Sequence, residues 1–201
     1  MLNYSEASER NKQPIFNRLV PYLTADTRVL EIGSGSGQHA LFIASQLPQI
    51  SWQPSEQAQY VEALALNIEQ LATDNIEKPL TLDVREKWPT QRFNAIYSAN
   101  TLHIMSWQSV QAFFVGASRG IAPCGYLFVY GPFRYQSKFT APSNRAFDQM
   151  LRERDPQSGI RDFEAVNALA DKAGFSLVAD YEMPANNQLV IWQHSLITKP
   201  A

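Results

Sequence analysis

The stretch Val29-Leu30-Glu31-Ile32-Gly33-Ser34-Gly35-Ser36-Gly37-Gln38 decides the fold. An apolar run meets an acidic residue, and glycine then occupies every second position. Glycine has no Cβ and tolerates positive φ, so such a loop lets its backbone approach a ligand closely. The pattern over 38–47 predicts a helix, whose free N–H groups point back at the loop. Strand, glycine turn and helix start together predict a nucleotide-type cofactor site.

The identity of the cofactor depends on where the glycines stand. Nicotinamide and flavin folds use G-x-G-x-x-G, and counting from Gly33 the third glycine is replaced by Gln38. The pattern is instead E-x-G-x-G-x-G, beginning at Glu31. It resembles the first motif of the Rossmann-like S-adenosylmethionine methyltransferases. The resemblance implies that the loop, including Gly33, Ser34 and Gly35, holds the methionine and ribose parts of that cofactor.

Length and composition predict one globular domain, residues 1–201. The chain has 201 residues, of which 45% are apolar and 18% charged, so it can bury a core. A net charge of −2 offers no basic excess for a phosphate backbone, and we expect no nucleic-acid partner. Cys124 is the single cysteine, which is typical of a reducing compartment. No apolar run is long enough for a membrane span, and residues 1–6 do not resemble a signal peptide, so we expect a cytoplasmic protein.

Hydrophobic periodicity predicts a doubly wound α/β sheet. Strands are expected at 29–32, 49–53, 80–82, 93–98 and 126–130, followed by a closing pair at 175–181 and 188–195. Helices are expected at 10–23, 38–47, 58–71, 108–119, 143–154 and 162–173. Residues 1–9 are expected to be poorly structured, and 131–142 form a polar segment. The result is a mostly parallel, seven-stranded sheet with an antiparallel C-terminal hairpin strand, another likeness to the methyltransferases.

Carboxylates stand at the ends of three predicted strands. Glu56 ends the second strand, where it is expected to accept the hydroxyls of a ribose; capping the next helix is the alternative. The likeness to methyltransferases implies that Asp83 accepts from the adenine amine while the Val84 N–H meets a ring nitrogen. A simple turn aspartate is the alternative for Asp83. Glu31 either supports the glycine loop or reaches the amino group of the methionine moiety.

The segments after the fourth and fifth strands supply the candidate acceptor side. Ligands bind at this edge of open α/β sheets, and Asn100 offers both a donor and an acceptor there. His103 is the candidate catalytic base, because an ordinary histidine pKa suits that work; a packed histidine is the alternative. Tyr130, Phe133 and Arg134 are candidates for the wall of a substrate pocket, with Arg134 serving an anionic group. A solvated aromatic loop is the alternative for these three.

Histidine and cysteine spacing gives no sign of a metal site. His39, His103 and His194 are far apart in sequence, and Cys124 has no cysteine partner. We therefore expect no bound metal. His39 falls in the first turn after the glycines, where it borders the expected cofactor.

Several short motifs, taken in order, narrow the resemblance. They are Ala7-Ser8-Glu9-Arg10-Asn11-Lys12-Gln13-Pro14-Ile15, residues 31–40, Trp52-Gln53-Pro54-Ser55-Glu56, Asn100-Thr101-Leu102-His103-Ile104 and Tyr130-Gly131-Pro132-Phe133. Over nearly the whole chain they resemble the methyltransferase-like family known as domain of unknown function 938. Members usually have aspartate at the position of Glu56, a conservative change for ribose binding. The match implies a fold and a cofactor, S-adenosylmethionine, but no substrate.

The same match gives weight to Arg10 and Asn11. They are expected to close over the cofactor as part of an N-terminal lid, residues 1–24, on the substrate side. An exposed pair on a covering helix is the alternative.

The leading hypothesis is S-adenosylmethionine-dependent methyl transfer to a small molecule. The N-P-P-Y type signature of amine-directed nucleic-acid methyltransferases is absent, since Ser98-Ala99-Asn100-Thr101 stands in its place. A non-catalytic sensor or partner subunit that binds the cofactor is the first alternative, because only His103 indicates turnover. A nicotinamide oxidoreductase is less favoured, because Gln38 and a missing Tyr-x-x-x-Lys pair count against it. The acceptor and the oligomeric state stay open.

Overall fold

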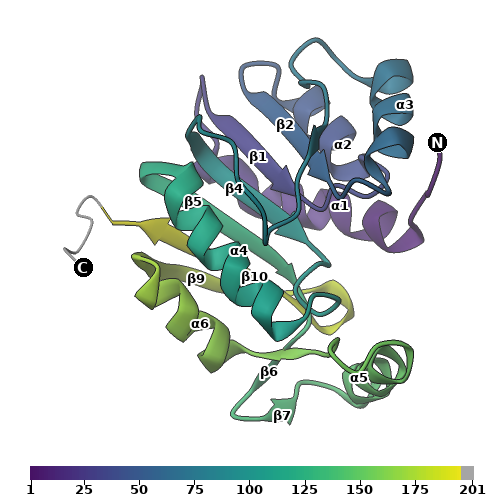
Figure 1. Ribbon diagram of the computed structural model, residues 1–201, viewed down its shortest axis with the longest axis vertical. Coiled ribbons are helices and arrows are strands. Elements are labelled where there is room, and N and C mark those ends of the chain that lie inside the picture. Colours follow the sequence, from purple (N-terminus) through teal and green to yellow (C-terminus); the bar gives the residue numbers. More distant parts are fainter. Residues whose placement is uncertain (196–201) are drawn as a thin grey trace.

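The computed structural model describes residues 1–195 and is built on a seven-stranded sheet (Figure 1). The strand order is β3-β2-β1-β4-β5-β10-β9. Strands β1 to β5 are parallel, and β10 lies antiparallel between β5 and β9. The bounds are β1 (Arg28–Ile32), β2 (Ser51–Glu56), β3 (Leu80–Thr81), β4 (Phe93–Ala99), β5 (Ile121–Gly131), β9 (Phe175–Met183) and β10 (Asn187–His194). The doubly wound, mostly parallel sheet predicted from the sequence is confirmed.

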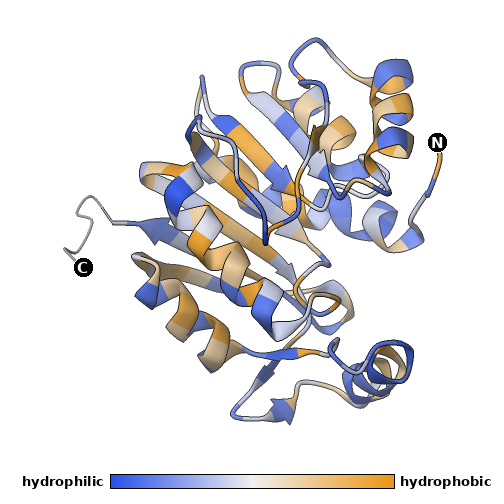
Figure 2. Ribbon diagram, viewed as in Figure 1, coloured by the Kyte–Doolittle hydropathy of each residue, from blue (hydrophilic) through white to orange (hydrophobic). Residues whose placement is uncertain are grey.

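Helices cover both faces of this sheet, which explains why its central strands are apolar on both sides. Side chains of α1 and α2 pack with Tyr97 and Phe128 on one face. Side chains of α4 and α6 pack with Ile96 and Trp192 on the other face. Figure 2 shows orange along the central strands and blue over much of α5. The helices are α1 (Glu6–Leu19), η1 (Val20–Tyr22), α2 (Gln38–Gln46), α3 (Val61–Leu71), α4 (Trp107–Gly120), α5 (Pro142–Arg154), α6 (Phe163–Lys172) and η2 (Pro184–Asn186).

The N-terminal residues differ most from the expectation. Residues 1–9 were expected to be poorly structured, but α1 begins at Glu6. Ser5 caps it, because its hydroxyl oxygen accepts a hydrogen bond from the Ser8 N–H (3.2 Å). The helix ends at Leu19 rather than at residue 23, and the short helix η1, with Pro21 inside it, follows. Residues 5–10 are mostly polar and show no apolar period, so periodicity did not predict a helix over them. The helix begins there after the Ser5 cap.

A second, smaller sheet replaces the expected polar segment 131–142. Its order is β7-β6-β8, formed by β6 (Phe133–Tyr135), β7 (Lys138–Phe139) and β8 (Arg161–Asp162). β6 and β8 are parallel and nearly thirty positions apart in the chain, as in the pair Arg134 and Asp162. Strands of two or three residues leave too short a pattern to be read from a sequence.

Two strands of the main sheet, β2 and β5, extend furthest beyond their predicted bounds. β2 continues through Pro54 to Glu56, with Pro54 opposite Glu31 of β1. β5 begins at Ile121, and its register with β4 shifts between Phe93 and Ala95. Within residues 1–195, no helix combines the length and apolar character that crossing a bilayer requires.

Candidate functional site

The loop between β1 and α2 changes direction at three glycines whose backbones are in the left-handed conformation. Gly33, Gly35 and Gly37 have φ values of 73°, 57° and 83°. A Cβ on Gly33 would lie 2.7 Å from Thr101 Cγ2, so the backbone approaches its neighbour as only glycine permits. A Cβ on Gly35 would meet no atom within 4 Å. The loop is therefore open at Gly35, and a ligand can lie against the backbone there.

Glu56 lies directly beside this opening. Its Oε2 accepts a hydrogen bond from the Gly35 N–H (2.9 Å), and its Oε1 accepts from the Gln57 N–H (2.8 Å). Each carboxylate oxygen has a further lone pair, so the group can still accept hydroxyl donors. The side chain expected to bind a ribose thus contacts the glycine loop itself.

Glu31 is buried at the end of β1, where it is only 2% exposed. Its Oε2 accepts from the Trp52 indole N–H (2.9 Å). Burial raises the pKa of Glu31 to about 7, although hydrogen bonds from Trp52 and Ser34 oppose that shift. Its backbone carbonyl also accepts from the Ser55 hydroxyl (2.5 Å). These contacts tie Glu31 to β2 beside the loop, and its role toward the amino group of the methionine moiety stays a prediction.

Asp83 follows β3 and is already paired with a cation. Arg85 donates to both of its carboxylate oxygens, through Nε at 2.9 Å and Nη2 at 2.5 Å. These side-chain hydrogen bonds hold the pKa of Asp83 below its ordinary value. An adenine amine would share this carboxylate with Arg85. The Val84 side chain is buried in the core, so any contact with an adenine would come from its backbone.

The three carboxylates fit the donor groups of S-adenosylmethionine. Glu31, Glu56 and Asp83 stand at the ends of β1, β2 and β3, which are neighbours in the sheet. The cofactor presents an amino group, a ribose diol and an adenine amine, and a carboxylate accepts hydrogen bonds from each. With the open backbone at Gly35, the residues present suit this cofactor.

Asn100 and His103 occupy the turn after β4. Asn100 has a left-handed backbone (φ 57°), and its N–H donates to the Tyr130 carbonyl at the end of β5 (2.8 Å). The His103 ring is 5% exposed and meets the Phe147 ring edge to face, with centroids 5.3 Å apart. Burial, followed by Arg161 and Arg154, lowers the pKa of His103 to about 4. The ring is therefore neutral near pH 7 and less basic than the sequence suggested.

The segment Ser158–Arg161 holds the backbone around His103. The Gly159 N–H donates to the His103 carbonyl (2.8 Å), and the Ser158 hydroxyl donates to the Ile104 carbonyl (3.1 Å). The Arg161 guanidinium donates to the carbonyls of Leu102 (3.0 Å, from Nε) and Met105. Four consecutive carbonyls are thus bound by one distant segment. No local pattern in the sequence indicated this contact.

A buried hydrogen-bonded chain joins α1 to the sheet through His39. Its Nε2 lies 2.7 Å from Asn11 Oδ1, and its Nδ1 lies 3.1 Å from the Tyr97 hydroxyl. Burial lowers the pKa of His39 to about 4, so the ring is neutral. The partners then assign the proton to Nε2, which donates to Asn11, while Nδ1 accepts from Tyr97. His39 lies in the first turn after the glycines, and these contacts are with the protein's own side chains.

Gln38 and Asn67 fasten the first residues of the chain over the glycine loop. The Ser5 N–H donates to Gln38 Oε1 (2.7 Å), and Gln38 Nε2 donates to Glu9 (3.1 Å). The Leu2 N–H donates to Asn67 Oδ1 (2.7 Å), while Asn67 Nδ2 donates to the Leu2 carbonyl (2.9 Å) and the Ser36 carbonyl (3.0 Å). We call these contacts the N-terminal latch. Gln38, which stands where dinucleotide-binding folds have their third glycine, therefore hydrogen-bonds to the start of α1, the helix that covers the loop.

Of the two residues expected to form a lid, Asn11 is buried and Arg10 is exposed. Asn11 is buried against His39, whereas the Arg10 side chain is 73% exposed and only approaches Glu6, at 4.0 Å. Arg10 therefore lies exposed on α1, and its closing over the cofactor stays a prediction.

Two of the three side chains expected to wall a substrate pocket, Phe133 and Arg134, have partners within the protein, and their role toward a substrate stays a prediction. Phe133 is 1% exposed and belongs to the core. Arg134 donates to Asp162 Oδ2 (2.7 Å), so its charge is paired within the small sheet. Tyr130 is 2% exposed on β5, and burial raises the pKa of its hydroxyl. In β6 the Phe133 side chain is buried, whereas the half-buried Arg134 reaches Asp162 of β8.

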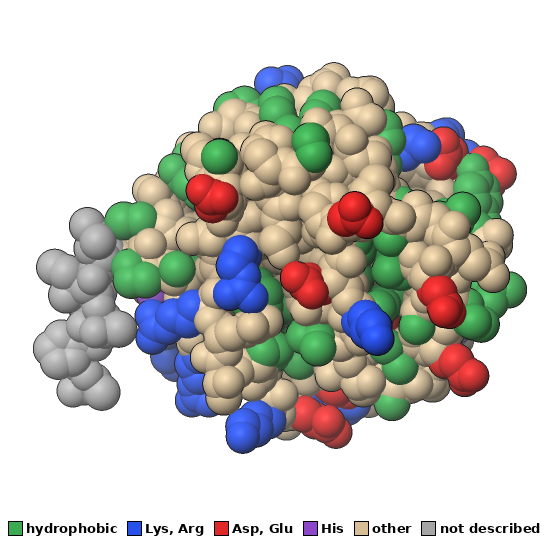
Figure 3. Space-filling model, turned by 90° about the horizontal axis from the view of Figure 1, so that it is seen from above, with side chains coloured by type: hydrophobic (Ala, Val, Ile, Leu, Met, Phe, Trp, Pro, Cys, Tyr) green, Lys and Arg blue, Asp and Glu red, His purple; other side chains and the backbone are tan. Residues whose placement is uncertain are grey.

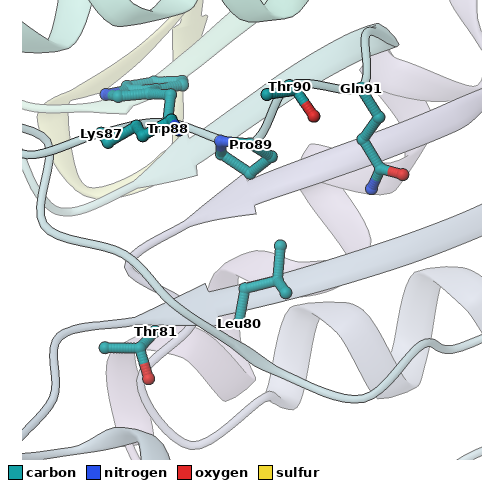
Figure 4. Close-up of a pocket in the computed structure, with 7 residues that line it drawn as sticks. All are labelled: Leu80, Thr81, Lys87, Trp88, Pro89, Thr90 and Gln91. Carbon is teal, nitrogen blue, oxygen red and sulfur yellow. The ribbon is translucent and has the colours of Figure 1, made fainter.

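One surface hollow lies beside β3, close to Asp83 and Val84 in the chain. It measures about 390 Å³ and is lined by Leu80, Thr81 and residues 87–91. Figure 4 shows the Leu80 side chain extending toward Pro89 and Gln91. None of the expected cofactor or acceptor residues lines it, so we do not assign it to the candidate site.

Known structures share this fold. An O-methyltransferase family protein from Burkholderia thailandensis superposes with a TM-score of 0.81 at 14% identity, covering 94% of this chain and 58% of that one. The S-adenosylmethionine-dependent methyltransferase SibL gives 0.79 at 18%, covering 94% and 56%. Human N-acetylserotonin methyltransferase, solved with SAM, gives 0.77 at 14%, covering 94% and 53%. The fold is that of the Rossmann-like methyltransferases, and this chain spans between half and three fifths of the length of these neighbours.

A family model assigns the chain to a smaller group than the fold does. A model described as protein of unknown function (DUF938) matches residues 2–194, and the chain belongs to that family. The resemblance found in its short motifs is thereby confirmed.

Proposed function

We propose that this protein is an S-adenosylmethionine-dependent methyltransferase that acts on a small molecule. The observation that carries the proposal is the opening at Gly35, where a left-handed glycine leaves its backbone accessible beside the Glu56 carboxylate. The likeness of the whole sheet to solved methyltransferases supports it.

The chain's own residues divide into cofactor and acceptor sides. Glu56 would accept the ribose hydroxyls, Asp83 the adenine amine and Glu31 the amino group. When bound, S-adenosylmethionine supplies an electrophilic methyl group. The protein's remaining task is to orient an acceptor and exclude water, for which Asn100 and the buried ring of His103 lie at the adjoining strand end.

His103 is proposed to orient the acceptor by a hydrogen bond. A base works best when its pKa lies near the working pH, and the pKa of His103 is lowered to about 4 by burial and by Arg161 and Arg154. It would serve as the base for a proton-bearing acceptor if a bound ligand raised that pKa. An acceptor that is already unprotonated needs no base.

Glu56→Ala tests the cofactor assignment. The change removes the acceptor beside Gly35 and should weaken S-adenosylhomocysteine binding at least about tenfold, as measured by titration calorimetry. Glu62→Ala, an exposed glutamate on α3, is the matched control and should bind like the unaltered protein. Equal affinity in both variants would show that Glu56 does not hold the ribose.

A non-catalytic cofactor-binding protein is the second candidate, favoured by the low pKa of His103. Labelled S-adenosylmethionine incubated with metabolite and protein extracts separates the two. Labelled acceptor supports the enzyme, and tight cofactor binding without any labelled acceptor supports the sensor.

A further inference from the structure

A larger cavity lies at the edge of the sheet opposite the glycine loop. Its volume is about 930 Å³, within the range of about 300–1,000 Å³ that small-molecule sites occupy. It opens between α4 and α6, where β9 begins and β10 ends. At this cavity Phe175 of β9 pairs with His194 of β10, beside the N-terminal part of β5. The glycine loop lies at the opposite edge of the sheet, near the C-terminal end of β5. The cavity is therefore separate from the proposed cofactor site.

His194 is a buried polar group that the proposed function does not use. It lines the cavity and is 7% exposed. Its Nε2 lies 3.4 Å from the Ser118 hydroxyl, and its Nδ1 is buried without a hydrogen-bond partner within residues 1–195. Burial, followed by Arg92, lowers the pKa of the ring. A ligand in the cavity would therefore meet the ring of His194 rather than Nδ1, because that atom has almost no surface open to the cavity.

Charge and apolar surface define the class of ligand. Among residues 1–195, Arg119 and Lys172 line the cavity together with one carboxylate, Asp171. Figure 3 shows Lys and Arg side chains gathered on the side that bears the C-terminal end of the described chain. The remaining wall mixes polar side chains, such as Gln111 and Ser118, with an apolar part that includes Phe114 and Phe175. Cations attract an anionic group, and aromatic walls bury a carbon skeleton.

We propose that this cavity is a second binding site, for a small carboxylate with an aromatic or other apolar body. The carboxylate lies toward Arg119 and Lys172, and the body packs on Phe114, Phe175 and the ring of His194. This assignment does not depend on methyl transfer, and its test uses no cofactor.

The histidine resonances of the whole protein give a local readout, because the chain has three histidines. The probe is 1-naphthoate, followed by NMR of the imidazole C–H groups. We expect a saturable shift of the His194 signals, with those of His39 and His103 unmoved. The absence of a His194 shift up to about 10 mM probe would overturn the proposal.

Matched ligands and variants test the charge and the apolar body separately. Lys172→Ala and Arg119→Ala should each weaken binding about tenfold, whereas Lys138→Ala, an exposed lysine on β7, should not change it. Neutral 1-naphthalenemethanol and inorganic phosphate should both bind more weakly than 1-naphthoate. If the alcohol binds as tightly as 1-naphthoate, the preference for an anion is refuted. If phosphate binds as tightly, the apolar subsite is refuted. If Lys172→Ala and Lys138→Ala lose the same affinity, the ligand does not bind beside Lys172.

Discussion

At the residue scale, the environments of single side chains decide what the site can do. Glu31, His39 and His103 have the exposures of core residues, at 2%, 6% and 5%, and burial shifts each pKa toward the neutral form. Near pH 7 the two buried imidazoles close to the glycine loop are therefore neutral, and the Glu31 carboxyl is about half ionised. Glu56, partly exposed, is the carboxylate best placed to meet a ligand.

Glu31 makes stability depend on pH. Its folded pKa of about 7 lies above the ordinary value of 4.5, so its contribution is fully present below pH 4.5 and is lost as pH rises through 7. Glu31→Gln removes this dependence and keeps an oxygen for Trp52. The stability of the variant relative to the unaltered protein should rise by up to about 3 kcal/mol from pH 4.5 to pH 8, measured by urea unfolding. A difference that stays constant with pH would contradict the burial of the charge.

At the element scale, α1 is a cover fixed by specific contacts with the loop. Gln38→Ala should release the N-terminal latch, because it removes the partners of Ser5 and Glu9. Amide exchange of residues 2–12 should then accelerate about tenfold or more. Gln46→Ala at the other end of α2 is the control, since within residues 1–195 its side-chain amide hydrogen-bonds only to Ser45. Equal exchange in the two variants would mean that α1 is held by apolar packing alone.

The turn that carries His103 depends on a second element, the segment Ser158–Arg161. Arg161→Met removes donors to two carbonyls of that turn, so exchange of amides 100–106 should accelerate. Arg154→Met is the matched control, because Arg154 also lowers the pKa of His103 but is not among the groups that bind these carbonyls. Both variants should raise the pKa of His103 in an NMR titration, and only Arg161→Met should loosen the turn. A rigid turn in Arg161→Met would count against this role.

Elements with a strong local pattern could be predicted, and contacts between distant elements could not. The apolar run 29–32 and the following glycines placed β1, the loop and α2 nearly where they lie, because period and turn chemistry are local. The positions of Glu56 and Asp83 followed from strand ends in the same way. The latch pairs Leu2 with Asn67, sixty-five residues apart, and no spacing encodes it. The pairing of Arg134 with Asp162 could not be predicted, because Asp162 belongs to a strand of two residues.

At the scale of the whole molecule, the sheet separates two regions. The glycine loop and His103 lie at the end of β5 and its parallel neighbours, and the cavity of His194 lies at the opposite edge. The antiparallel β10 reaches both edges, with Gln188 opposite Gly131 and Gln193 opposite Tyr126. A ligand at either end therefore stabilises the same sheet, and each can be titrated separately.

Cofactor-dependent stabilisation of the whole protein tests the central claim most directly. Saturating S-adenosylhomocysteine, at about a hundred times its dissociation constant, should raise the unfolding midpoint by roughly 5–10 °C, whereas NADH should leave it unchanged. Stabilisation by NADH and none by S-adenosylhomocysteine would contradict the assignment of the glycine loop to S-adenosylmethionine.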